Sequence, residues 1–416
     1  VEQIDSDVLE NRPVNSVSEA IESTVAGLYV EPTNGAPGSA PNINIRGYTG
    51  FNQKGGPLVL VDGVERRIVD VNPNDVESIS VLKDAAASAI YGSRAPSGVI
   101  LITTKSGEKG EKIRVNYSGS YNIGSPIGMP TWANSYEYAE KMNELYRNNL
   151  RTPIYKEETI QLMRDYASGK IDYNNVVVEN GKWGAHWDMF GNSDWFDIMF
   201  KDKVPSQQQN INFSGGSKNT TYYMGFGYNQ SEGIIRETND KKDRYTTLLK
   251  VSTDATDWLQ LRLSMNYLKT DEVGVNYRGR GTDYTDIWAN AAATLPNWND
   301  INPDGNPSFL SSGPSMRGEG GNQINDRNES TLTGGFTLNP FEGFNIKGNY
   351  TWKNYTRHFN RNTFVIYVEE ADGTIRRSAR SAGQDQVHRT MDLQNYHTFD
   401  LVADYSKQVK KHSFYA

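Results

Sequence analysis

The fold of this protein is decided by the stretch WLQLRLSMNYL (Trp258–Leu268), in which apolar and polar side chains alternate. One face of the predicted strand carries only apolar side chains: Leu259, Leu261, Leu263, Met265 and Tyr267. A period of two indicates a β-strand whose faces meet different environments. The stretch is longer than the usual strand of about five or six residues. It is close to the roughly nine to eleven residues that a tilted transmembrane strand needs.

The same alternation recurs after about residue 106. Further strands are predicted at Ile113–Tyr121, Ile211–Gly215, Thr221–Gln230, Tyr245–Thr253, Leu332–Leu338, Phe344–Asn354 and Thr398–Tyr405. Short links alternate with long ones, and the short links are Gly216–Thr220, Asp254–Asp257, Pro340–Gly343 and Lys407–His412. Outer-membrane β-barrels combine short periplasmic turns with long extracellular loops in this way. A half-buried sheet in water also alternates, so the pattern alone leaves a soluble β-rich protein open.

The composition excludes several classes of protein. The mean hydropathy is −0.67, and no run of 18 apolar residues occurs, which excludes helical membrane spans. A net charge of −7 argues against nucleic-acid binding. The chain has no cysteine and only five scattered histidines, so we expect no disulfide, no metal site and no cofactor. No catalytic constellation appears, and we therefore expect a protein that is not an enzyme.

The first part of the chain reads as a compact α+β domain. The segment NSVSEAIESTVAG (residues 15–27) predicts a helix that is capped by Ser16 and stopped by Gly27. Strands are predicted in PLVLVDGV (57–64), ESISVL (77–82) and GVILITT (98–104). A short helix starting at Asp84 is expected before the last of them. In the first long link, two amphipathic surface helices are predicted at Ser135–Asn148 and Glu157–Ser168.

A specific motif identifies a family. The segment VESISVLKDAAASAIYGSRAPSGVILITTKSG (Val76–Gly107) closely resembles the plug signature of SusC/RagA-like TonB-dependent transporters. INIRGYTG (Ile43–Gly50) and PLVLVDGV match the same family in order and spacing, and Ile211–Ile234 looks like its second and third barrel strands. The resemblance implies an α+β plug domain (residues 1–106), followed by the first eight to nine strands of an antiparallel transmembrane β-barrel with long extracellular loops (residues 107–416).

The barrel is expected to be incomplete in this sequence. The family's barrels have about 22 strands, whereas this sequence stops inside the predicted ninth strand. Neither the TonB box nor the small β-sandwich extension that is common in the family precedes Val1. We therefore expect an N-terminal piece of a longer protein. If the short turns are periplasmic, the first strand runs outward, and the plug begins on the periplasmic side.

The resemblance implies active import of a bulky nutrient, an oligosaccharide or a peptide, across the bacterial outer membrane. The implied partners are a SusD-like surface lipoprotein, the lipid of the outer membrane, and TonB, which acts through a segment absent from this sequence. A TonB-dependent receptor for iron chelates or a vitamin is the first alternative. A secreted β-rich enzyme, adhesin or glycan-binding protein is the second.

Three groups of residues are candidates for function. The resemblance implies that Arg46 and Arg94 pair with glutamates of the barrel wall and hold the plug, although both also fit ordinary surface arginines. Ligand contacts are expected in the Gly-rich segment YTGFNQKGG (Tyr48–Gly56), at Asn52, Gln53 and Lys54. The alternative for this segment is a solvated linker.

The third group is aromatic. WGAHWDMFGNSDWF (Trp183–Phe196) places Trp183, Trp187 and Trp195 in one long loop. Aromatic faces stack on sugar rings and anchor interfaces, and the alternative is that these rings fold the loop on itself. NPDGNP (Asn302–Pro307) contains acidic and amide residues typical of calcium loops, but it lacks the later acidic ligand, which favours a turn.

Overall fold

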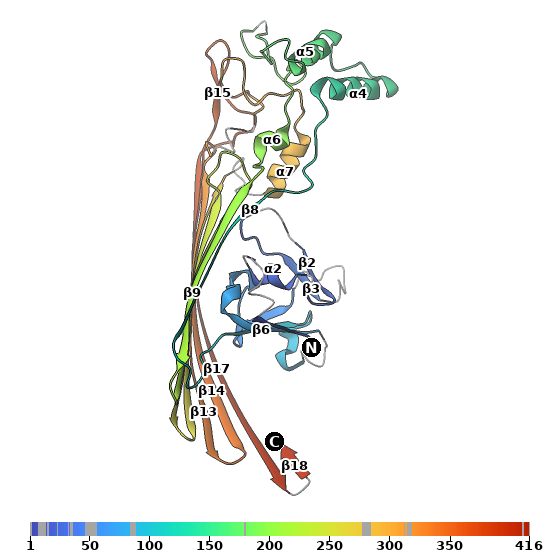
Figure 1. Cartoon of the computed structure of the whole chain (residues 1–416). Helices are drawn as coiled ribbons and strands as arrows, with labels where there is room; N and C mark the ends of the chain where they lie inside the picture. Colours follow the sequence, from blue (N-terminus) through green and yellow to red (C-terminus); the bar gives the residue numbers. More distant parts are fainter. Residues whose placement is uncertain are drawn as a thin grey trace.

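The computed structural model describes the chain except residues 1, 7–13, 15, 23, 32, 34–35, 46–55, 84–88, 179, 277–283, 312, 314–317, 410–411 and 416. A small N-terminal domain lies beside a tall, curved sheet, about midway along its height (Figure 1). We call the sheet face that meets this domain the inner face and the opposite face the outer face. In the described part of the chain, no helix is both long enough and apolar enough to cross a membrane.

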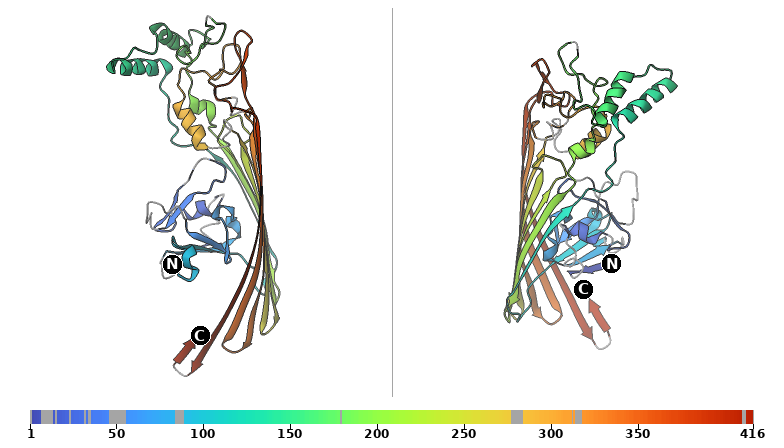
Figure 2. Two further views of the ribbon diagram at one scale, coloured as in Figure 1. Left: turned by 180° about the vertical axis from the view of Figure 1, so that it is seen from behind. Right: turned by 45° about the horizontal axis from the view of Figure 1, so that its top comes forward.

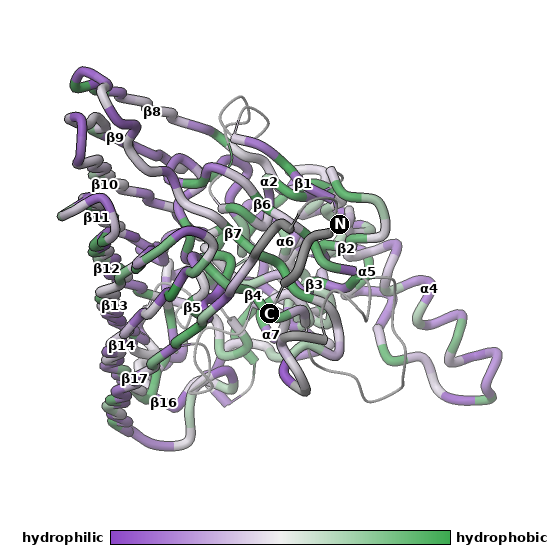
Figure 3. The backbone as a smooth tube through the Cα atoms, turned by 90° about the horizontal axis from the view of Figure 1, so that it is seen from below, coloured by the Kyte–Doolittle hydropathy of each residue, from purple (hydrophilic) through white to green (hydrophobic). Residues whose placement is uncertain are grey.

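The N-terminal domain is built on a mixed sheet of five strands in the order β1-β6-β7-β4-β5. The strands are β1 (Glu2–Asp5), β4 (Leu58–Val61), β5 (Val64–Glu65), β6 (Val76–Leu82) and β7 (Val99–Thr104). Only β4 and β7 run parallel. The remaining elements are α2 (Val17–Ile21), the hairpin β2 (Leu28–Glu31) and β3 (Asn42–Ile45), and the 3-10 helices η1 (Ile68–Asp70), η2 (Pro73–Asp75) and η3 (Ala89–Arg94). Figure 3 shows that β4, β6 and β7 are largely hydrophobic.

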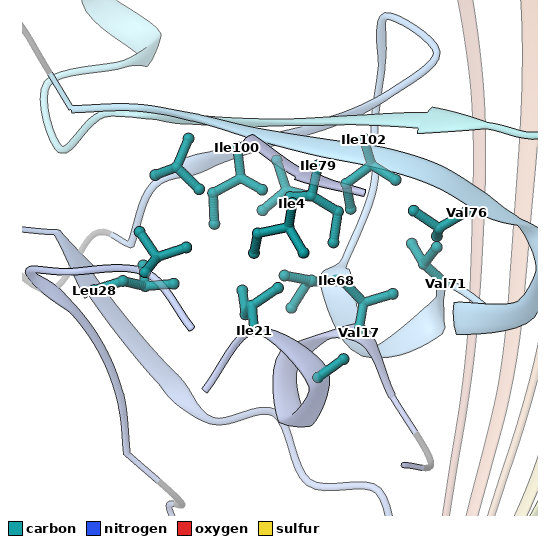
Figure 4. Packing of buried hydrophobic residues seen from close by; sticks show 14 of the residues in the cluster. Ile4, Val17, Ile21, Leu28, Ile68, Val71, Val76, Ile79, Ile100 and Ile102 are labelled. Carbon is teal, nitrogen blue, oxygen red and sulfur yellow. The ribbon is translucent and has the colours of Figure 1, made fainter. Parts of the chain in front are cut away.

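Helix α2 covers one face of this sheet and closes the core. Ser16 caps it as predicted, since its side chain accepts a hydrogen bond from the Glu19 amide (3.4 Å). The fully buried Ile21 lies opposite Ile79 and Ile100 of the sheet (Figure 4). The helix ends at Ile21 and not near Gly27, because the chain turns there towards β2. The helix predicted from Asp84 begins outside the described residues, and Ala89–Arg94 form η3.

The tall sheet contains nine antiparallel strands paired in sequence order. They are β8 (Arg114–Gly124), β9 (Val204–Gly216), β10 (Thr220–Glu232), β11 (Lys241–Thr256), β12 (Leu259–Val275), β13 (Asn322–Phe341), β14 (Phe344–Thr363), β17 (Gln386–Val409) and β18 (His412–Tyr415). The predicted strands and the first three short links are therefore confirmed, whereas the fourth link, Lys407–His412, includes residues 410–411, which lie outside the described residues. Most strands are longer than predicted, up to 24 residues in β17, because pairing continues into polar ends where the apolar alternation has stopped.

The outer face of the tall sheet is apolar and ringed by aromatic side chains. Leu263 of β12 pairs with Val251 and Gly334 on the neighbouring strands, and it is 45% exposed. Tyr228 and Tyr245 pack together near one edge of the apolar band, with their ring centroids 5.1 Å apart and their planes tilted by 33°. At the other edge, stacked phenylalanine rings and a tyrosine gather, namely Phe341, Phe344 and Tyr405. Transmembrane barrels carry such aromatic girdles at both membrane interfaces.

The two ends of the tall sheet differ (Figure 1, Figure 2). At the loop end, the long links form α4 (Ser135–Asn148), α5 (Glu157–Ala167), α6 (Trp195–Met199), α7 (Tyr284–Ala293) and the hairpin β15 (Tyr367–Glu369) with β16 (Ile375–Arg377). Helices α4 and α5 confirm the two predicted surface helices. At the turn end, short turns join the strands. The link between β10 and β11 lies at the loop end; it was expected to be long but spans only residues 233–240.

Candidate functional site: the plug–wall interface

Two glycines of β10 allow the N-terminal domain to approach the tall sheet closely. Gly225 and Gly227 lie on the inner face, since Phe226 between them points outward. A Cβ atom on Gly225 would lie 2.2 Å from Asp75 Oδ1, and one on Gly227 would lie 2.5 Å from Asn72 Nδ2. A side chain at either position would therefore displace the Asp75 or Asn72 side chain from its place against the strand.

Hydrogen bonds fix η2 in this position. Tyr223 Oη donates to Asp75 Oδ1 (2.8 Å), and Asn72 Nδ2 donates to Asn210 Oδ1 of β9 (2.9 Å) and to Asp75 Oδ2 (3.2 Å). Burial raises the pKa of the Asp75 carboxyl, and the hydrogen bond from Tyr223 offsets this rise only in part. The carboxylate is thus held by its hydrogen bonds without a cation in direct contact among the described residues.

Buried ion pairs join the two parts in both directions. Arg66 of the N-terminal domain donates through Nε and Nη2 to Glu329 Oε1 of β13 (3.0 and 2.9 Å). Lys353 Nζ of β14 lies 3.3 Å from the second oxygen of Glu329. In the reverse sense, Arg327 Nη2 of β13 donates to Asp70 Oδ1 of η1 (2.5 Å). All four side chains of the two arginine–carboxylate pairs are at most 10% exposed.

The charge balance at Asp70 differs from that at Asp75. Burial alone would raise the pKa of the Asp70 carboxyl, but the charges of Arg327 and Arg67 outweigh it and lower the pKa. Asp70 is therefore a firmly ionised partner of the arginine on β13. Arg244 of β11 adds a hydrogen bond to the Val69 carbonyl oxygen beside it.

A third ion pair lies nearer to the turn end and is less buried. Lys250 Nζ of β11 lies 2.9 Å from Asp62 Oδ2 and donates to the Thr104 carbonyl oxygen (2.8 Å). Asp62 also accepts hydrogen bonds from the Thr104 amide (3.0 Å) and hydroxyl (2.6 Å). Asp62 is the first residue of the predicted Asp-Gly turn, and its φ of 49° together with 85° at Gly63 confirms the turn.

Two cavities flank this interface. One, of about 600 Å³, lies between the N-terminal domain and the loop-end parts of β8 to β11, where Ser206, Ser231 and Lys242 line it. The other, of about 440 Å³, lies beside the turn-end parts of β11 to β14, where Ser252, Arg262 and Thr351 line it. The ion pairs of Asp70 and Glu329 lie at intermediate positions along β13. In the described part of the chain, no group of three or more histidine or acidic side chains is arranged to hold a metal ion.

The structure describes only part of the predicted site. Arg94 lies 3.8 Å from Glu65 of its own domain, and both side chains are largely exposed. Its pairing with a barrel-wall glutamate stays a prediction. Arg46 and the proposed ligand contacts Asn52, Gln53 and Lys54 lie outside the described residues, and their roles also stay predictions.

The three loop tryptophans differ in exposure. Trp195 is fully buried in α6, where its Nε1 donates to the Leu295 carbonyl oxygen (3.0 Å), so it packs the loop as the alternative interpretation states. Trp183 is half-buried and donates through Nε1 to Asp304 Oδ2 (3.1 Å). Trp187 is 40% exposed and packs edge-on against Tyr155. Of the three, Trp187 offers most surface to a ligand. The Asn302–Pro307 segment forms a turn, with Gly305 at φ 86°.

The interface residues were not predicted from the sequence, although a signal for them is present. Asn325, Arg327 and Glu329 occupy alternate positions of β13, so both charges fall on the face that carries the polar residues. The other polar side chains of this face are mostly short and uncharged, so long charged side chains among them indicate contact with a charged partner. Arg66 directly follows β5, the short strand after the predicted Asp-Gly turn, but nothing in its local pattern identifies its partner on β13.

Comparison with known proteins supports a common class. Residues 1–99 match the TonB-dependent receptor plug domain family. The chain is 29% identical over 249 residues to the TonB-dependent receptor SusC of Bacteroides thetaiotaomicron, a match that covers 58% of this chain and 21% of that protein. It is 26% identical over 411 residues to a TonB-dependent receptor of Formosa agariphila, covering 96% of this chain and 35% of that protein.

A solved structure of the RagAB peptide transporter has the same fold. The TM-score is 0.73 at 22% identity, and the match covers 99% of this chain and 46% of that chain. The present chain spans between 21% and 35% of the length of the curated relatives it matches.

The N-terminal domain is therefore the plug of a TonB-dependent receptor, and the tall sheet is part of its outer-membrane barrel. Within this class, the plug match, the relatives and the shared fold support the predicted SusC/RagA-like TonB-dependent transporter, and they agree with the predicted fold class and location in the outer membrane. The outer face of β8 to β18 is accordingly the lipid face, and the inner face is the barrel wall that meets the plug.

Proposed function

We propose that the full-length protein imports a bulky nutrient, an oligosaccharide or a peptide, across the outer membrane by TonB-dependent active transport. A SusD-like surface lipoprotein would cover the loop end. TonB would pull on the plug. The relationship to SusC and the fold shared with a peptide transporter support this cargo class over small chelates.

The observation that carries the proposal is the polar nature of the plug–wall contact. The described contacts are hydrogen bonds and ion pairs, such as Arg66 with Glu329 and Tyr223 with Asp75, whereas the apolar core of the plug lies within the plug itself. The attraction within a buried ion pair exceeds the cost of removing its charges from water by only a small amount. When the plug moves away, water that enters the interface solvates these charges and restores much of the lost free energy. Such an interface holds the plug in one place and still lets it be pulled away.

A reversible crosslink tests whether the plug must move. The Cβ that Gly225 would carry lies 3.1 Å from Asp75 Cγ, so cysteines at both positions are within reach of a disulfide, whose Cβ atoms are about 3.5–4.5 Å apart. This chain has no cysteine of its own. We expect the oxidised Gly225→Cys/Asp75→Cys variant of the full-length protein to lose import and to regain it on reduction. The reduced form is the control, and equal import in both forms would contradict plug movement.

The cargo is tested by growth of a deletion strain. Supplying glycans, peptides or chelated iron as the limiting nutrient separates the proposed cargo from that of the alternative receptor. Complementation with the full-length gene must restore growth on the same nutrient. A growth defect confined to chelated iron or a vitamin would show that the cargo is this smaller ligand and not an oligosaccharide or a peptide.

A further inference from the structure

The plug approaches the middle of β10 closely and leaves cavities elsewhere along the barrel wall. The interface is filled at Gly225, Gly227 and the buried Tyr223 of β10, whereas the cavity of about 600 Å³ lies at the loop end. Against β11 to β14, the cavity of about 440 Å³ extends from the plug turn at Asp62 and Gly63 towards the turn end of the wall. The strand register explains its breadth, because one row of inward positions joins Ser252, Arg262, Gly335, Asn349 and Asp400 across five strands.

Short hydroxyl and amide side chains line this cavity: Thr221, Ser252, Ser264, Thr333, Asn349 and Thr351. Hydroxyl groups donate and accept hydrogen bonds alike, so they suit a chain that carries its own hydroxyl or amide groups. The cations of the cavity already have partners. Lys250 pairs with Asp62, and Arg262 donates to the Thr337 hydroxyl (2.6 Å) and to Asn349 Oδ1 (3.3 Å).

Among the described residues that line the cavity, no aromatic or long apolar side chain faces inward, although Val251 and Leu263 border it through their backbone strands. Passage through a pore requires sites that are favourable enough to enter and weak enough to leave. Many weak hydrogen-bonding groups meet this requirement better than a tight aromatic site. The lining thus has the chemistry of a passage for an uncharged polar chain.

The roof of the cavity is the most exposed of the described ion pairs between plug and wall. Asp62 and Lys250 are 28% and 19% exposed, whereas Arg66 and Glu329 are 5% and 10% exposed. Partly exposed pairs are screened by water and contribute less to stability than ideal geometry suggests. Movement of the plug therefore separates Asp62 from Lys250 at a lower cost than it separates the buried pairs.

We infer that cargo passes the plug along the inner face of β11 to β14, through this cavity, and that the Asp62–Lys250 pair opens first. The cargo is an uncharged chain of hydroxyl- or amide-bearing units. The inference rests on the proposed function, which it extends by naming the route and the groups that line it.

Bulky groups attached to single cysteines test the route. In the full-length protein, Ser264→Cys places a thiol in the cavity, and Asn116→Cys places one on the inner face of β8, away from it. Each variant is modified with a large thiol reagent, and import of a neutral oligosaccharide or peptide that the wild type takes up is measured. We expect loss of import only for modified Ser264→Cys. Import by both modified variants, or loss in both, would overturn a route confined to β11–β14.

A second measurement tests the roof. In the Ser264→Cys background, we expect Lys250→Gln to increase the rate at which the introduced thiol is labelled from outside the cell. Lys109→Gln is the matched control, because it removes another partly exposed Lys–Asp pair, with Asp254, at the turn end. An unchanged labelling rate in Lys250→Gln would contradict the role of the Asp62–Lys250 pair as the roof of the cavity. If the wild type imports none of the offered oligomers, the proposed function fails; the route fails separately, when the wild type imports and the modified variants do not differ.

Discussion

Leu263→Arg should prevent efficient insertion of the barrel, because it places a charge near the middle of the lipid face. The apolar outer positions of β12 run from Leu259 to Tyr267, and the next outer residue, Lys269, pairs with Asp271. At roughly 3.3 Å per residue, this band measures roughly 26 Å along the strand. A tilt of about 40° reduces it to roughly 20 Å of height, close to the apolar band of about 25 Å in such barrels. Leu263 lies at its centre.

The expected cost follows from this depth. An arginine on the lipid face near the bilayer midplane destabilises a transmembrane barrel by about 2–4 kcal/mol. Ser264→Arg is the matched control, since it introduces the same side chain one residue further on, where the side chain enters the polar cavity of about 440 Å³. We expect the control to cost much less, with only weak repulsion from Lys250, its partner in register on β11.

The measurement is the free energy of folding of the full-length variants into lipid vesicles, from reversible denaturant titrations. A large loss for Leu263→Arg with near-wild-type stability for Ser264→Arg supports the assigned faces. Equal stabilities for the two variants would refute the assignment of lipid to the outer face of β12, and a greater loss for Ser264→Arg would reverse it.

Three further predictions concern the plug and the loops. Asp70→Asn should destabilise the docked plug by about 3–5 kcal/mol by leaving a buried arginine unpaired, whereas Asp75→Asn should cost less, about 1–3 kcal/mol, because it disturbs one hydrogen bond and leaves no contacting cation unpaired; protease sensitivity of the plug measures both. Because the pKa of Asp70 is lowered on docking, its contribution is complete above the unfolded pKa and is lost as the pH falls through the folded value; protection that rises on acidification would contradict this pairing. Gly227→Val should displace the plug from β10 and raise leakage of polar solutes in a liposome-swelling assay, and wild-type permeability would count against the close approach. Trp195→Ala should make the loops protease-sensitive, whereas Trp187→Ala should weaken ligand binding only, as measured by calorimetry; the opposite pattern would exchange their roles.

Sequence alone predicts the strands because the lipid face leaves a direct pattern. Hydrocarbon on one side and water or plug on the other produce the alternation of β12, and the tight turns follow from chain reversal at the periplasmic end. The lengths of the polar strand ends were missed for the same reason. Beyond the apolar band both faces are polar, so the pairing of residues such as Lys269 or Arg357 leaves no period in the sequence.

The plug–wall contacts in the structure were not predicted from the sequence. The expected pairs of Arg46 and Arg94 stay predictions, and the structure forms an arginine–carboxylate pair at other positions, Arg66 and Glu329, which are 263 residues apart. No local rule connects positions so distant, because their meeting depends on where the plug lies within the barrel. That position depends on Gly225 and Gly227, whose role becomes visible only once Asn72 and Asp75 are placed against them.

The asymmetry of this interface connects stability with transport. A plug held equally on all sides would release as a whole or not at all. Here the close approach to the backbone of β10 and the buried ion pairs of β13 fix the plug. The partly exposed Asp62–Lys250 pair, in contrast, covers a polar cavity. A pulling force first breaks the contact whose separation costs the least free energy. The plug therefore opens on the side of the cavity that already has space and hydrogen-bonding groups. Strengthening that one pair should therefore slow import more than strengthening a buried pair, although the buried pair contributes more to stability.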